Sequence, residues 1–156
     1  MVKKRIPTGR IILWIVTALV LIFVFVQSVL PEAVSAEESG WFRTHIMTPL
    51  CRLFGIQTPS QRTVRKLAHV FEFTVLAALL VPSFSGSLSK GLQGGFAAAF
   101  LDESIQLLSG RGGQLQDVWI DLIGVALGAL IGLALIQIVK YSRVKCSRKN
   151  ESDRSA

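Results

Sequence analysis

The feature that most constrains this chain is an unbroken run of 20 uncharged residues from Ile11 to Leu30. At about 1.5 Å per residue, a helix of this length covers the roughly 30 Å hydrocarbon core of a bilayer. Hydrophobic residues make up 51% of the sequence and charged residues only 17%, whereas soluble domains carry about 25% charge and disordered chains have few apolar residues. The sequence therefore predicts an all-α integral membrane protein.

Three further apolar segments follow the first, separated by stretches rich in proline, glycine and serine. We predict four transmembrane helices, over residues 11–30, 64–84, 91–108 and 117–139. They form a single membrane domain over residues 1–156, in which residues 140–156 are a basic cytoplasmic tail.

The first helix has an alternative interpretation as a signal peptide, because basic residues precede it and Val34-Ser35-Ala36 resembles a cleavage site. A typical signal peptide has an apolar stretch of only about 7–15 residues. This stretch is longer, and Pro31 separates it from the candidate cleavage site. We therefore favour an anchor that is retained.

Between the first two predicted helices, residues 39–56 carry apolar side chains at nearly helical spacing, with arginine and histidine among them. This pattern favours a short helix that lies in the membrane interface and is bent at Pro49. An irregular loop with exposed aromatic side chains explains the pattern equally well.

The net charge of +7 comes from basic residues that flank the apolar segments. This arrangement argues against nucleic acid as a partner, since a binding groove needs basic residues gathered on one folded face. With both termini inside, the inner side holds 11 lysines and arginines and the outer side 6. We therefore predict a multi-pass protein with both termini in the cytoplasm. Cys51 and Cys146 belong to no CxxC motif.

Ionisable residues inside a membrane helix are costly and mark functional sites by default. Three of the predicted helices carry such residues at similar depth. Measured from the outer end of each helix at about 1.5 Å per residue, His69 lies about 4.5 Å in, Glu103 about 9 Å and Asp121 about 6 Å. The inner halves of these helices carry no charge. We therefore expect a polar cluster that is open to the outer face.

Residues three and four apart share one face of a helix, so these polar side chains form stripes. The stripes are Lys66, His69, Glu72 and Phe73 on one helix, Asp102, Glu103 and Gln106 on the next, and Asp117 and Asp121 on the last. Below the last pair, Gly124, Gly128 and Gly132 repeat the GxxxG spacing, which lets a neighbouring helix approach closely. We therefore expect the last helix at the centre of the bundle.

Single members of this cluster also have structural interpretations: an ion pair for Glu72, a helix contact for His69, a solvated loop charge for Arg111. As a set, the acidic groups repel one another unless they are protonated, paired or bound to a cation. Carboxylates suit Ca²⁺, Mg²⁺ or Mn²⁺, while one histidine is few for zinc. From the sequence we assign no metal and no cofactor. Whether a carboxylate acts with His69 as general acid and base stays open.

Taken together, these residues resemble the pattern of the VanZ-like family. The matching segments are Lys66-Leu67-Ala68-His69-Val70-Phe71-Glu72-Phe73, Asp102-Glu103-Ser104-Ile105-Gln106, Gly110-Arg111, and Asp117 with Gly124 and Gly128. The resemblance covers residues 65–136, which we take as the VanZ-like core. At two positions the chain departs from the pattern, with Phe73 where the family usually has tyrosine and Asp121 where it usually has asparagine.

The resemblance implies a small protein of the bacterial cell membrane, in a family whose namesake is associated with low-level teicoplanin resistance. We expect the polar cluster to bind a membrane lipid, a lipid-linked wall precursor or a glycopeptide antibiotic near the outer leaflet. The candidate ligand-binding residues are Lys66, His69, Glu72, Asp102, Glu103, Gln106, Arg111, Asp117 and Asp121. Two alternatives stay open: a membrane enzyme that modifies a lipid-linked substrate with the same residues, and a structural membrane protein. The sequence leaves the catalytic residues and the oligomeric state undefined.

Overall fold

The computed structural model describes residues 7–110 and 115–155, with side chains from residue 116 as far as residue 145 in the second range. Every regular element within these ranges is helical. The elements are α1 (Thr8–Val29), α2 (Glu32–Phe42), the π-helical turn η1 (Arg43–Met47), α3 (Thr48–Leu53), α4 (Gln61–Ser83), α5 (Leu88–Leu108) and α6 (Leu115–Ser155). The predicted all-α class is therefore confirmed.

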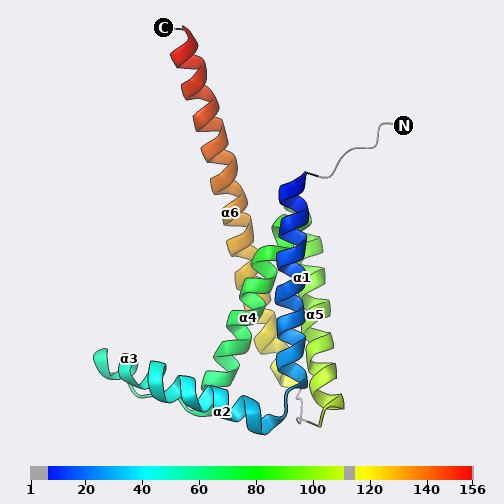
Figure 1. Ribbon diagram of the computed structural model, residues 1–156, viewed down its shortest axis with the longest axis vertical. Helices are drawn as coiled ribbons and strands as arrows, with labels where there is room; N and C mark the ends of the chain where they lie inside the picture. The colour runs from blue at the N-terminus through cyan, green and yellow to red at the C-terminus, as the bar shows by residue number, and fades with distance from the viewer. Residues whose placement is uncertain (1–6, 111–114, 156) are drawn as a thin grey trace.

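Four long helices, α1, α4, α5 and α6, form the bundle (Figure 1). Two of them combine the length and apolarity needed to cross a membrane: the 22 residues Thr8–Val29 and the 30 residues Gln116–Lys145. The other two are 23 and 21 residues long but carry more of the polar groups. The start of α1 and the far end of α6 lie at the same end of the bundle (Figure 1). Helix α6 continues to Ser155, so the predicted tail extends this helix.

The predicted interfacial helix begins earlier than expected. The chain leaves α1 at Leu30 in an extended conformation, and α2 starts directly after Pro31, at Glu32 rather than near Ser39. From there α2, η1 and α3 run on as one helical arm that crosses the end of the bundle (Figure 1). Proline has a fixed φ angle and lacks the backbone N–H group that would be left without a partner at the start of a helix. Pro31 therefore favours a helix that begins directly after it.

A π-helical turn, Arg43–Met47, lies just before Pro49, the position at which the sequence predicts a bend. Proline cannot donate the backbone hydrogen bond that an α-helix requires. The backbone N–H and the hydroxyl of Thr48 both donate to the carbonyl oxygen of Arg43, the hydroxyl at 2.9 Å. Trp41 and Leu53 on this arm are exposed, in keeping with a helix that lies against an apolar phase.

The closest helix contact in the bundle joins α4 to α6. A Cβ atom added at Gly124 would lie 2.5 Å from the carbonyl oxygen of Val70, and one at Gly132 would lie 3.0 Å from that of Ala78. At Gly128 the added atom would overlap the carbonyl oxygen of Thr74. Since only glycine leaves this space free, the repeated GxxxG spacing determines how near α6 lies to α4.

Helix α1 packs against α4 and α5 through one narrow face. Thr17, Val24 and Ser28 are buried on it, at intervals of seven and four residues that bring them to the same side of the helix. The hydroxyls of Thr17 and Ser83 lie 3.0 Å apart and share a hydrogen bond. Val20, Leu21 and Phe25 are partly buried and also pack against the core, whereas other apolar side chains of α1, such as Leu19 and Phe23, face outward. An apolar exterior of this kind suits a helix surrounded by lipid.

We predict that Gly128→Ala lowers the free energy of unfolding by about 1–3 kcal/mol, because the new methyl group has no space beside Thr74. Gly9→Ala is the matched control, since a Cβ there has no neighbour within 4 Å. Thermal unfolding of the detergent-solubilised proteins measures both. If Gly128→Ala and Gly9→Ala unfold at the same temperature, the proposed role of the close α4–α6 contact is wrong.

Candidate functional site

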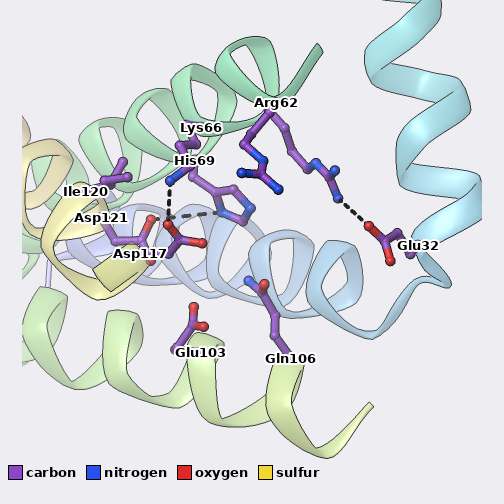
Figure 2. A pocket seen from close by; sticks show the side chains of 10 residues that line it. Glu32, Arg62, Lys66, His69, Glu103, Gln106, Asp117, Ile120 and Asp121 are labelled. Carbon is purple, nitrogen blue, oxygen red and sulfur yellow. Dashed lines mark hydrogen bonds and ion pairs between the residues drawn. The ribbon is translucent and has the colours of Figure 1, made fainter. Parts of the chain in front are cut away.

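A pocket lined mostly by charged groups lies between α4, α5, α6 and the start of the arm (Figure 2). Its volume is about 120 Å³. We call it the polar pocket; its lining residues are Glu32, Arg62, Arg65, Lys66, His69, Glu103, Gln106, Asp117, Ile120 and Asp121. These residues come from α2, α4, α5 and α6, so the pocket depends on the packing of the bundle.

The structure brings six of the nine candidate residues to this pocket. These are Lys66, His69, Glu103, Gln106, Asp117 and Asp121. Two others lie just outside it: Glu72 faces a neighbouring groove, and Asp102 is fully buried behind the pocket wall. Arg111 lies outside the described residues. Sequence reasoning missed Arg62 and Arg65 among the pocket residues. They stand four positions before Lys66 and His69 respectively, and that helical spacing could have included them.

Ion pairs join the walls of the polar pocket. The Nζ atom of Lys66 lies 2.8 Å from Oδ1 of Asp117, which links α4 to α6. The Nη1 atom of Arg65 lies 3.6 Å from Oε1 of Glu32, which links α4 to the arm (Figure 2). Both pairs include partly exposed side chains, so each adds little stability by itself. Their effect is to hold cationic and anionic groups around one opening.

His69 lies at the centre of this arrangement. Its Nδ1 atom is 4.0 Å from Oε2 of Glu72, one turn further along α4, and 4.0 Å from Oδ1 of Asp121 on α6. Figure 2 shows His69 and Asp121 facing each other across the pocket, with Glu103 on the opposite wall. An imidazole beside several carboxylates can exchange protons with them or share a bound cation with them.

Asp102 connects the site to α1. It accepts a hydrogen bond from the hydroxyl of Ser28 and another, at 2.8 Å, from Nε2 of Gln106. Both Asp102 and Ser28 are completely buried. Sequence reasoning missed Ser28; the signal was two hydroxyl residues, Thr17 and Ser28, placed 11 residues apart and so on one face of an apolar helix.

Three of these side chains lie close enough to share an ion. The possible ligand atoms of His69, Asp102 and Asp121 all fall within 4.8 Å of one another. They belong to α4, α5 and α6 respectively.

An apolar groove adjoins the polar pocket. It has a volume of about 900 Å³ and lies between the arm and α4. Its apolar lining includes Val34, Trp41, Phe42, Met47, Leu67 and Phe71. Arg65 and His69 line both the groove and the polar pocket, so the two spaces meet at these side chains.

The fold and the site together define a helical membrane protein in which a charged pocket opens beside an apolar groove. Sequence comparison assigns the family: the VanZ/LLP1 family matches residues 12–137, most of the chain, and the protein belongs to it. The match begins well before the VanZ-like core expected at residues 65–136 and includes α1 and the arm. This is consistent with the contact between Ser28 of α1 and Asp102 of the site.

A relative in Bacillus subtilis (strain 168), named uncharacterized membrane protein YwnJ, is 39% identical to this chain over 70 residues. The aligned region covers 45% of this chain and 49% of the relative, so the chain spans about half the length of that protein. No solved structure matches the chain. The family and this relative support a location in the membrane.

We predict that Ser28→Ala destabilises the protein by about 1–3 kcal/mol, because it leaves the buried carboxylate of Asp102 short of one hydrogen-bond donor. Ser104→Ala is the matched control, since among the described residues that hydroxyl donates to the carbonyl of Phe100 in its own helix, at 2.7 Å, and to no side chain of another helix. Thermal unfolding in detergent compares the two variants. Equal stability of both would show that Ser28 does not support the site.

Proposed function

We propose that this protein binds an amphiphile of the bacterial cell envelope: a membrane lipid, a lipid-linked wall precursor or a lipoglycopeptide of the teicoplanin type. The observation that carries the proposal is the meeting of the polar pocket and the apolar groove at Arg65 and His69. An amphiphile has the same two parts, a charged head and an apolar chain, joined at one point. The polar pocket would receive the head and the groove would receive the chain.

The charges of the polar pocket indicate the chemistry of the head group. Arg62, Arg65 and Lys66 stand along α4, while the carboxylates of Glu103 and Asp121 line α5 and α6. Arginine and lysine bind phosphate oxygens well. Carboxylates accept hydrogen bonds from hydroxyl or ammonium groups. The arrangement therefore fits a head that carries a phosphate together with sugar hydroxyls or an amine.

The groove is suited to an acyl or polyprenyl chain. Its volume of about 900 Å³ lies within the range of known small-molecule sites, about 300–1,000 Å³. Leu67 and Phe71 of α4 form one wall, and Trp41 and Phe42 of the arm form the other. A chain that enters the groove from the bilayer exchanges one apolar environment for another, so its binding there depends on van der Waals packing against these side chains.

The proposal places the polar pocket at the outer leaflet, where wall precursors and lipoglycopeptides are encountered. It takes α1, α4, α5 and α6 as four spans and both termini as cytoplasmic. The support is the excess of lysine and arginine on the proposed inner side, 11 against 6.

Thiol labelling in intact cells tests this orientation. In a variant with Cys51 and Cys146 replaced by alanine, Ser109→Cys at the pocket end of α5 should react with a membrane-impermeant maleimide. Ser89→Cys, at the opposite end of the same helix, should react only after lysis. The reverse pattern would place the polar pocket on the cytoplasmic side and contradict the proposed encounter with wall precursors.

Lipid capture tests binding. The full chain is extracted from bacterial membranes into polymer nanodiscs, and the retained amphiphiles are measured by mass spectrometry. We expect Arg65→Gln and Lys66→Gln to reduce the retained amphiphile about tenfold, the effect of losing one hydrogen bond to a charged group. Ala68→Trp, which fills the exposed groove wall, should reduce it similarly. Lys90→Gln, an exposed cation at the other end of α5, is the matched control.

Two outcomes of this experiment would contradict the proposal: a retained lipid population equal to that of bulk membrane, or equal retention by wild type and Ala68→Trp. Teicoplanin susceptibility of a sensitive Gram-positive host separates the possible ligands. If wild type raises resistance and membrane-inserted Glu103→Gln does not, the ligand belongs to wall synthesis or is the drug itself. Unchanged susceptibility with intact lipid capture leaves an envelope lipid as the ligand.

A second function is favoured by the position of His69, 4.0 Å from carboxylate oxygens of both Glu72 and Asp121. Such a group can transfer protons, so the same pocket would suit a membrane enzyme that modifies a lipid-linked substrate. Glu72→Gln distinguishes the two functions, because Glu72 lies outside the lining of the polar pocket but beside His69. An enzyme would stop converting the retained amphiphile in this variant, whereas a binding protein shows no conversion in wild type and keeps its retained amphiphile in the variant.

A further inference from the structure

We propose that His69, Asp102 and Asp121 form a binding site for a divalent transition-metal ion, with Mn²⁺ or Zn²⁺ as the ion. The proposal goes beyond amphiphile binding and does not depend on it, because it concerns only side chains of the chain itself. It would change the chemistry of the polar pocket, since a metal ion there can polarise a phosphate or carbonyl oxygen.

The first support is geometric. One ligand atom from each of the three side chains lies within 4.8 Å of the other two. An ion at the centre of atoms spaced in this way lies at most about 2.8 Å from each of them, compared with about 2.0–2.2 Å in a zinc site with nitrogen and oxygen ligands. Small rotations of the side chains close that difference. The three ligands come from three helices, so the ion would join α4, α5 and α6.

The second support is the state of Asp121. Only 2% of this residue is exposed, and its carboxylate points toward His69 and the pocket (Figure 2). Within residues 7–110 and 116–145 no group donates a hydrogen bond to this carboxylate; its one ion-pair contact is His69 Nδ1 at 4.0 Å, beyond hydrogen-bond length. A buried carboxylate is costly unless it is protonated, paired, hydrogen-bonded or bound to a metal. A cation between Asp121 and Asp102 would supply the missing interaction.

The surroundings of Asp102 resemble the outer support that metal ligands receive. Ser28 and Gln106 each donate a hydrogen bond to its carboxylate and so fix its orientation. Hydrogen bonds of this kind orient ligands and raise metal affinity. Ser28 and Gln106 are therefore positioning residues for the proposed site.

The ligand set favours one class of ion. Imidazole suits transition metals, while carboxylates suit manganese and also bind zinc; because the site has one histidine and two carboxylates, Mn²⁺ fits it better than Zn²⁺. Calcium and magnesium take oxygen ligands, which makes His69 an unfavourable partner for them. Two carboxylates balance the charge of a divalent ion. Three protein ligands leave a coordination position for a water molecule or a ligand of the polar pocket.

Metal titration of the purified chain is the test. The full chain in detergent is treated with a chelator, dialysed and titrated with MnCl₂ and with ZnCl₂ by calorimetry. Mn²⁺ binding is followed independently by electron paramagnetic resonance. We expect about one ion per chain, and a loss of affinity of about 100-fold or more in Asp121→Asn and Asp102→Asn. Ser28→Ala should weaken binding about tenfold through the orientation of Asp102.

Asp117→Asn is the matched control. Asp117 is an acidic residue of the same pocket, one turn before Asp121, but it pairs with Lys66 and is not among the three clustered ligands. This variant should bind the ion with nearly wild-type affinity. Either of two results overturns the proposal: wild type that binds neither ion at submillimolar concentration, or equal affinity in wild type and Asp121→Asn. The wild-type titration decides the matter even if a variant fails to fold.

Discussion

The close approach of α4 and α6 is the constraint on which the rest of the structure depends. Glycines at three successive turns of α6 let the backbone of α4 lie directly against it, with carbonyl oxygens of α4 where side chains would otherwise stand. One or two turns nearer the pocket end, the same contact brings His69 to Asp121 and Lys66 to Asp117. Van der Waals packing between small residues therefore determines the positions of the charged groups, and the charged groups add little to the packing.

Much of this arrangement could be predicted from the sequence because it repeats with the period of a helix. The polar cluster is predicted by the stripes of polar residues on α4, α5 and α6. The close packing of α6 is predicted by the spacing of Gly124, Gly128 and Gly132. The start of the arm at Glu32 was missed, since residues 32–38 show no apolar periodicity. Ser28 was missed because a single hydroxyl in an apolar helix usually bonds its own backbone. Only its neighbours in space show that it also donates to Asp102.

Different kinds of interaction hold the two ends of the bundle together. At the end of the bundle where α1 begins, apolar contacts such as that between Trp14 and Phe84 join the helices. A hydrogen bond between the hydroxyls of Thr17 and Ser83 lies in the same region. At the other end, ion pairs and hydrogen bonds connect side chains from different helices. Polar groups in a low-dielectric environment interact strongly but are costly when incompletely paired. These polar groups are concentrated at one end, which is the end where the proposed binding sites lie.

Two hydrogen bonds hold the arm to the start of α4 and to the segment just before it. Arg43 donates a hydrogen bond to the carbonyl of Pro59 at 2.8 Å, and the side-chain amide of Gln61 donates to the carbonyl of Ala36. These contacts hold the arm beside the start of α4, so the apolar groove between the arm and α4 is present without a bound ligand. A preformed groove leaves the entropy cost of association mainly with the guest. Apolar chains that are already stiff through double bonds or branching lose fewer conformations when they bind. The groove would therefore select amphiphiles by the rigidity of their chains as well as by their hydrophobicity.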